Sequence, residues 1–167
     1  MNLPSRRLHR LKSYDYSQSG YYFITVCTKF RRKILSDVSC ANEIIPTDLG
    51  KSVIQIWNNI NNTYENIKTD CFCLMPNHIH GIIIIRNQSV HVTEEERGRR
   101  SSLDDAVRGL KSVTTCEFNK FVPEHEKNNL WQLSFYDEVI KSEDMLYEVR
   151  KYINENPKTW KTDEYYI

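Results

Sequence analysis

Residues 75–85 read Met-Pro-Asn-His-Ile-His-Gly-Ile-Ile-Ile-Ile, and this run decides the predicted fold. Pro76-Asn77 is a turn pair, and the apolar runs on both sides of it predict a hairpin of strands at residues 67–74 and 78–86. Because side chains two residues apart leave a strand on the same face, His78 and His80 point together. Two convergent imidazoles are half of a metal site, and the pair alone is compatible with Zn, Mn, Fe or Ni.

The remaining elements complete the order β-α-β-β-α-β, which a last helix follows. Apolar periodicity and the flanking cap or breaker residues predict strands at residues 21–28 and 130–140 and helices at residues 47–60, 102–118 and 142–156. This order is typical of an α+β fold, the ferredoxin-like split β-α-β arrangement, with an antiparallel sheet and helices on one face. In that topology we expect the histidine pair near the middle of the sheet's open face.

Length and composition indicate a single domain. At 167 residues the chain can bury a sizeable core, and we expect one unit over residues 1–167, with a basic arm at 1–18 and a mobile polar loop at 87–101. The five cysteines lack a CxxC pair, which favours free thiols in a reducing cytosol. No run approaches the roughly 20 apolar residues of a membrane span, so we expect a cytoplasmic protein with no membrane partner.

The charges are unevenly distributed although the net charge is only +1. Residues 1–33 contain one acid, Asp15, and the following cations: Arg6, Arg7, Arg10, Lys12, Lys29, Arg31, Arg32 and Lys33. Tyrosine and phenylalanine residues interleave with them, and cations combined with aromatic rings are typical of surfaces that grip phosphates and stack unpaired bases. The alternative interpretation is a solvated basic tail that leads into an aromatic strand.

The predicted last helix contributes a second pair of candidate site residues. Tyr152 and Asn156 are four positions apart, so both side chains leave the same face of the helix, one turn apart. If that face lies over the histidine pair, Asn156 can offer an oxygen ligand to a metal, and Tyr152 becomes a candidate nucleophile. A tyrosine with an ordinary pKa near 10 attacks poorly unless a metal polarises the phosphate. The alternative is that Tyr152 simply packs at the end of the helix.

Five motifs, spread in order from residue 5 to about residue 160, carry a family resemblance. They are Met75-Pro76-Asn77-His78-Ile79-His80-Gly81, Tyr14-Asp15-Tyr16-Ser17 through Tyr21-Tyr22-Phe23-Ile24-Thr25, Val107-Arg108-Gly109-Leu110-Lys111-Ser112, Trp131-Gln132 through Phe135-Tyr136-Asp137, and Tyr152-Ile153-Asn154-Glu155-Asn156-Pro157. Together they resemble the single-tyrosine HUH transposases. Within that family they are most similar to the branch associated with repetitive extragenic palindromes (REPs), which is related to the 200/605-type insertion sequences. Many relatives have a histidine where this chain has Glu138, so any role of that position is open.

The resemblance implies a chemistry and a set of site residues. It implies that His78 and His80 bind a divalent metal, Mg or Mn, and that Asn156 completes the metal site. It implies that Tyr152, on the C-terminal helix, cleaves single-stranded DNA through a 5′-phosphotyrosine bond and transfers the strand to another 3′ end. The expected partner is single-stranded or hairpin DNA. The residues expected to bind it are Arg6, Arg7 and Arg10 on the hairpin backbone, Arg31 and Arg32 at the strand end, Arg108 and Lys111 on the exposed side of a helix, and Trp131 as a stacking platform.

Two other functions remain open at this point. One is a catalytically silent DNA-hairpin-binding protein of the same fold. The other is a zinc hydrolase, which would need a carboxylate or a third histidine beside the pair, whereas His9, His91 and His125 all lie in segments predicted as tail or loop. The sequence also leaves open the DNA target, the native metal, and whether the protein is a monomer or a homodimer.

The basic arm generates a prediction about salt dependence. Deleting residues 1–12 removes four cations (Arg6, Arg7, Arg10 and Lys12), and each neutralised phosphate contributes about 0.7–0.9 to the logarithmic salt slope. We therefore expect the truncated protein to bind a hairpin oligonucleotide more weakly and with a slope lower by about three units. Binding of both proteins across a salt series measures this. An unchanged slope would mean that the arm is a solvated tail.

Overall fold

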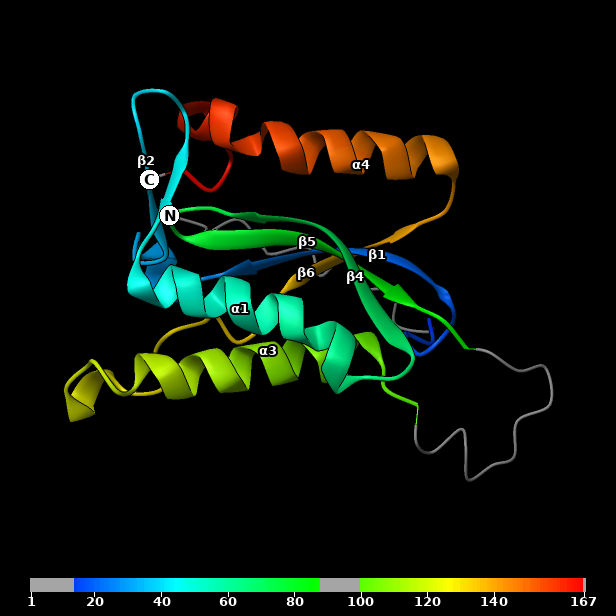
Figure 1. The fold of residues 1–167 in the computed structure, drawn as a ribbon, viewed down its shortest axis with the longest axis horizontal. Coiled ribbons are helices and arrows are strands. Elements are labelled where there is room, and N and C mark those ends of the chain that lie inside the picture. Colours follow the sequence, from blue (N-terminus) through cyan, green and yellow to red (C-terminus); the bar gives the residue numbers. More distant parts are fainter. Residues whose placement is uncertain (1–13, 88–99, 167) are drawn as a thin grey trace, which may run out of the picture.

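The computed structural model describes residues 14–87 and 100–166 of the chain (Figure 1). The predicted arm at 1–18 and loop at 87–101 therefore lie largely outside the described residues. The elements in chain order are β1 (Gly20–Cys27), the 3-10 helix η1 (Lys29–Arg31), β2 (Ser36–Val38), β3 (Ile44–Pro46), α1 (Asp48–Thr63), β4 (Ile67–Leu74), β5 (His78–Ile85), α3 (Leu103–Phe118), η2 (Glu124–Glu126), β6 (Tyr136–Ile140), α4 (Glu143–Glu155) and η3 (Asn156–Thr162).

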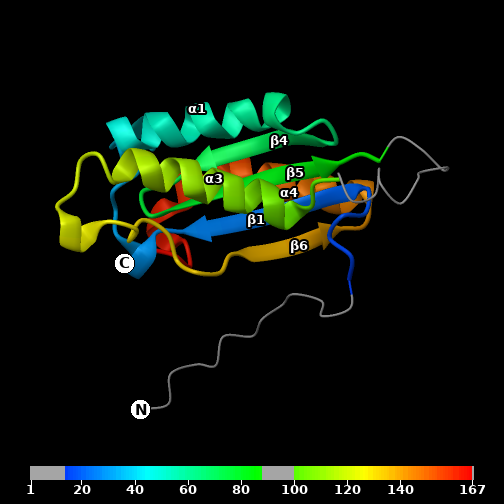
Figure 2. The same cartoon turned by 90° about the horizontal axis from the view of Figure 1, so that it is seen from below.

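The main sheet has the strand order β4-β5-β1-β6, and every neighbouring pair is antiparallel (Figure 2). This order confirms the predicted α+β split β-α-β arrangement and places β5 inside the sheet. Its first residue, His78, lies opposite Cys27, the last residue of β1. A second, two-stranded sheet of β2 and β3 was not predicted.

Helices cover both faces of the main sheet. α1 and α3 lie side by side on one face, whereas α4 crosses the other face and packs on β4 (Figure 1). Every residue of β5 is buried, which explains its unbroken isoleucine run. Ile79, Ile83 and Ile85 join the core under α1 and α3, while Ile82 and Ile84 join the core under α4. By this alternation His78 and His80 face α4. The expectation of helices on one face and an open face around the histidines is therefore wrong, because α4 covers that face and both residues are buried.

The strand predicted at residues 130–140 is shorter in the structure. β6 starts at Tyr136, and the preceding residues Leu130 and Trp131 are buried instead of following the sheet edge. Trp131 makes an isolated bridge with Thr28, and its indole Nε1 donates a hydrogen bond to Thr114 Oγ1 at 2.7 Å. The chain is thus anchored to the end of β1 and to α3 before it joins the sheet.

The structure confirms the residues at which the helices were predicted to begin. Thr47, Ser102 and Ser142 are the N-caps of α1, α3 and α4, and each side-chain oxygen accepts a backbone N–H three residues later. At α3 the Asp105 carboxylate also accepts the backbone N–H of Ser102, which completes a capping box. These caps fix where the helices begin, and so where α4 lies along the sheet.

Gly81 gives a testable packing constraint next to the histidine pair. A Cβ atom at this position would lie 2.3 Å from Cη2 of Trp57, whose buried ring stacks on Phe72. We expect Gly81→Ala to lower the free energy of unfolding by about 1–3 kcal/mol, because the indole must move within a packed core. Chemical denaturation measures the change. Gly20→Ala is the control, since its Cβ would meet the Tyr22 ring at an ordinary 3.6 Å, and equal midpoints for both variants would show that Trp57 can relax.

Candidate metal and nucleophile site

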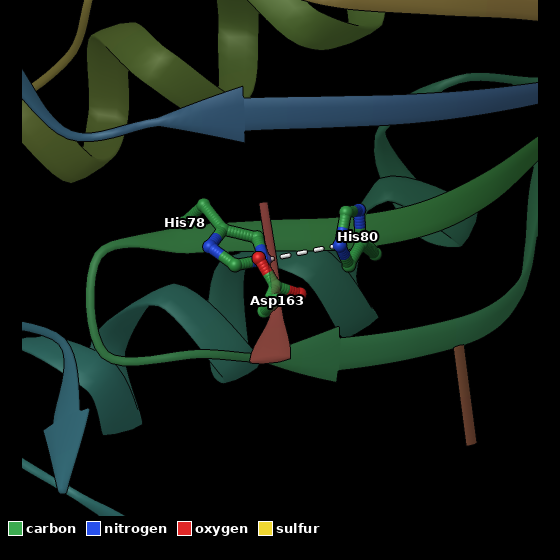
Figure 3. A group of neighbouring side chains, drawn as sticks. All are labelled: His78, His80 and Asp163. Carbon is green, nitrogen blue, oxygen red and sulfur yellow. Dashed lines mark hydrogen bonds between the residues drawn. The ribbon is translucent and has the colours of Figure 1, made fainter. Parts of the chain in front are cut away.

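The site begins with the two histidines at the start of β5. His78 and His80 are both buried, and their Nε2 atoms lie 3.0 Å apart (Figure 3). The rings meet edge to face, with centroids 4.5 Å apart. The predicted convergence of the two imidazoles is therefore confirmed.

Each imidazole is held through its other ring nitrogen. His78 Nδ1 lies 2.8 Å from the side-chain oxygen of Asn77, and His80 Nδ1 lies 2.8 Å from Thr25 Oγ1. The Asn77 amide nitrogen donates to the backbone oxygens of Arg31 and Tyr165, which fixes the amide so that its oxygen faces His78. Since an amide oxygen can only accept, His78 carries its proton on Nδ1 and its Nε2 lone pair is left for a ligand.

Burial keeps both imidazoles neutral. It lowers the pKa of His78 well below its ordinary value, with smaller contributions from His80 and the Arg31 charge. Burial also lowers the pKa of His80 to about 3. A neutral imidazole is the form that binds a metal, so the pair is ready to ligate at physiological pH.

α4 brings both predicted residues to the histidine pair. The Tyr152 hydroxyl lies 3.3 Å from His80 Nε2, and the residue is 42% exposed. Asn156 is 1% exposed and donates its amide N–H to Asp163 Oδ2 at 3.0 Å. Its side-chain oxygen is buried and has no hydrogen-bond partner among the residues that the structure describes. The i, i+4 spacing therefore does place both side chains at the site, as expected.

Asp163 is a candidate ligand that the sequence reasoning missed. Ligand atoms of His78, His80 and Asp163 all lie within 4.8 Å of one another (Figure 3). Asp163 directly follows η3, the 3-10 turn that continues α4 and bends the chain back to the site. Its other oxygen, Oδ1, accepts the backbone N–H of Tyr165, which fixes the carboxylate. No sequence spacing pointed to Asp163, because its position depends on how the chain turns after Pro157.

The donor set fits a divalent cation. Two imidazole nitrogens and one carboxylate converge, and the Asn156 amide contacts that carboxylate. The buried Asn156 oxygen has no hydrogen-bond partner among the described residues, and an unpaired buried amide oxygen is costly unless something binds it. Mixed nitrogen and oxygen donors suit Mn and related divalent ions, with the oxygens favouring Mn or Mg. Nearby Cys73 is not in this group of ligand atoms, and its thiol instead contacts the backbone oxygen of Leu74 and the sulfur of Met75.

The nucleophile candidate is a protonated phenol at the wall of a cavity. Burial raises the pKa of Tyr152 to about 12, with added contributions from the negative charges of Asp163 and Glu164. The cavity, of about 620 Å³, is also lined by Phe23, Tyr136 and His80. It is large enough to receive part of a substrate beside the Tyr152 hydroxyl.

Among the predicted DNA-binding residues that lie within the described residues, Arg31 is nearest to the site. Its guanidinium lies 5.2 Å above the ring of Tyr165, and it donates to the Glu164 backbone oxygen at 3.2 Å. Arg32 instead forms an ion pair with Glu126 at 2.8 Å and donates to the backbone oxygen of Asn129. Arg32 thus tethers a loop. Arg6, Arg7 and Arg10 lie outside the described residues.

The other predicted DNA-binding residues lie away from the histidine pair. Arg108 and Lys111 are on α3, which covers the opposite face of the sheet. Arg108 is exposed near Asp105, whereas Lys111 is half-buried and donates to the backbone oxygens of Gln132 and Leu133. The expectation for Trp131 is wrong: only 6% of the residue is exposed, so its ring is packed in the core and cannot stack on a base.

Comparisons with known proteins identify the family and the fold of the chain. Residues 16–156 match the family described as IS200-like transposases. An uncharacterised protein of Haemophilus influenzae is 31% identical over 172 residues, which cover 97% of this chain and 93% of the relative. A REP-associated tyrosine transposase, solved bound to a REP hairpin, shares the fold with a TM-score of 0.63 at 16% identity, over 90% of this chain and 74% of that one. A candidate transposase from Deinococcus radiodurans R1 superposes with a TM-score of 0.51 at 21% identity, over 87% and 95% of the two chains.

None of the helices within residues 14–87 and 100–166 is both long enough and apolar enough to cross a bilayer.

Asp163 generates a prediction about metal affinity. Asp163→Asn removes the carboxylate charge but keeps the shape, so we expect Mn affinity to fall by at least about tenfold. Titration of Mn into the DNA-free protein, followed by electron paramagnetic resonance, measures this without relying on activity. Glu164→Gln is the matched control, because it neutralises the adjacent carboxylate, which is outside the ligand group. Equal affinities for Asp163→Asn and wild type would remove Asp163 from the site.

Proposed function

Because the chain belongs to the family of IS200-like transposases, we propose that it is a metal-dependent DNA strand transferase that uses Tyr152 as its nucleophile. Its substrate would be single-stranded DNA that carries a hairpin. The observation that carries the proposal is the position of the Tyr152 hydroxyl, 3.3 Å from Nε2 of His80, where the two imidazoles converge.

The proposed reaction is a transesterification. The Tyr152 oxygen attacks the scissile phosphorus, the bond from phosphorus to the 3′ oxygen breaks, and the phenol proton is lost as the leaving 3′ oxygen takes one up. The product is a 5′-phosphotyrosine and a free 3′-hydroxyl. Because the phosphodiester energy is kept in the covalent bond, a second 3′-hydroxyl can displace Tyr152 and rejoin the strand without ATP.

His78, His80, Asp163 and the orphaned oxygen of Asn156 are the residues that would hold the cation, which we propose to be Mg or Mn. When bound, this ion supplies Lewis-acid charge neutralisation at the scissile phosphate. Asn77 and Thr25 orient the two imidazoles, and burial under α4 keeps water from competing for their lone pairs.

Two features support DNA as the substrate over a small molecule. The first 33 residues concentrate cations around aromatic residues, which suits a polyanion with unpaired bases. A solved relative of the same fold was captured on a REP hairpin. Asp163 supplies the carboxylate that a zinc hydrolase would need, but a tyrosine hydroxyl beside the imidazoles suits covalent strand transfer better than water activation.

Tyr152→Phe tests the proposed nucleophile. The substitution removes one oxygen atom, so we expect covalent adduct formation to stop while hairpin binding stays within a few-fold of wild type. The assay incubates protein and Mn with a pool of hairpin oligonucleotides that have randomised single-stranded flanks and a 3′ label. The label must be at the 3′ end, because the protein remains on the 5′ end of the downstream fragment.

Tyr147→Phe is the matched control, since Tyr147 is an exposed tyrosine on the same helix. An adduct that persists in Tyr152→Phe and maps to Tyr147 or Tyr136 would show that another tyrosine is the nucleophile. Hairpin binding by wild type with no adduct in Mn would favour the silent DNA-binding alternative.

A further inference from the structure

The turn that follows β1 is tied directly to the histidine site. The backbone N–H of Thr28 donates to the backbone oxygen of Asn77 at 2.8 Å. The side-chain amide of Asn77 donates to the backbone oxygen of Arg31 at 3.3 Å. Asn77 is the residue before His78 and holds its ring. Whatever binds the turn at residues 28–33 therefore lies beside the site.

Phe30, in the middle of this turn, is exposed at a conformational cost. The residue is 77% exposed, and its backbone adopts φ 59° and ψ 18°, the left-handed region, as does that of Arg31 with φ 53°. Glycine or asparagine would hold such a turn with less strain than a phenylalanine. Folding alone therefore does not explain an aromatic residue here, and a strained, exposed ring near a site points to function.

Cations and aromatic rings alternate around Phe30. The Lys29 ammonium lies 5.4 Å from the Phe30 ring, the Arg31 guanidinium lies over Tyr165, and the Lys33 ammonium lies 5.1 Å from the ring of Tyr166. Residues 28–33 contain no acid. Cations suit phosphates, whereas an exposed ring suits the face of an unpaired base, so this combination fits single-stranded nucleic acid better than a duplex with stacked pairs.

We propose that Phe30 stacks on an unpaired base of the DNA strand that enters the site, with Lys29, Arg31 and Lys33 placed to neutralise the flanking phosphates. This inference rests on the proposed function, because it assigns the residue that positions the strand for Tyr152. It also replaces Trp131, whose ring is buried, with a ring that is presented to solvent.

The test separates base contacts from phosphate contacts. Fluorescence anisotropy measures binding of the full-length protein to a thymidine oligonucleotide of about 12 nucleotides and to an abasic oligonucleotide of equal length. We expect Phe30→Ala to bind the thymidine oligonucleotide at least about fivefold more weakly and to bind the abasic one unchanged within twofold. Phe30→Trp should retain the affinity. Phe121→Ala, at a residue that is 76% exposed, should change neither.

A stability measurement distinguishes binding from a structural role. Phe30→Gly relieves the left-handed strain, so its unfolding midpoint should equal or exceed that of wild type while its affinity for the thymidine oligonucleotide falls. A lower midpoint together with unchanged binding would overturn the inference. So would an equal loss on both oligonucleotides, and the proposed function would survive either result if the Tyr152 adduct still forms at saturating DNA. Wild type that binds neither oligonucleotide would overturn the inference, whereas the proposed function is tested separately by the Tyr152 adduct on hairpin DNA.

Discussion

The pairing of β5 between β1 and β4 is the constraint on which the rest of the structure depends. Because strand side chains alternate, this register sends Ile79 and Ile83 into the core under α1 and α3 and sends His78 and His80 toward α4. A slip of one residue would bury the imidazoles among the apolar residues under α1 and α3 and turn isoleucines toward Tyr152. The isoleucine run and the caps of the flanking helices thus determine the fold and also the position of the two imidazoles beside α4.

The parts of the site that the sequence predicted are those set by local periodicity. The i, i+2 spacing in a strand places His78 and His80, and the i, i+4 spacing in a helix places Tyr152 and Asn156. Asp163 was missed because its position depends on the path of the chain after α4, which no short-range pattern encodes. The strand predicted from Leu130 and the choice of Trp131 as a stacking platform failed for a related reason: whether an aromatic residue packs or is exposed depends on what surrounds it in the fold.

Asn77 joins three parts of the molecule that are distant in sequence. Its side chain accepts from His78 and donates to the backbone oxygens of Arg31 and Tyr165, so one amide links the metal ligands, the turn after β1 and the C-terminal segment. Since all three bonds are buried or partly buried, losing any partner leaves a polar group unsatisfied. The position of the proposed DNA-binding turn is therefore coupled to the orientation of His78.

The electrostatics of the site give a further reason for a cation there. Burial leaves both imidazoles neutral and raises the pKa of the Tyr152 phenol, and the carboxylates of Asp163 and Glu164 raise that pKa further. A DNA phosphate that approached this pocket alone would be repelled by the negative charges of these two carboxylates. The nearby cation Arg31 donates to the Glu164 backbone oxygen and lies over the ring of Tyr165. A divalent cation held by His78, His80 and Asp163 would add two positive charges beside Tyr152. This added charge would make the pocket attractive to a phosphate.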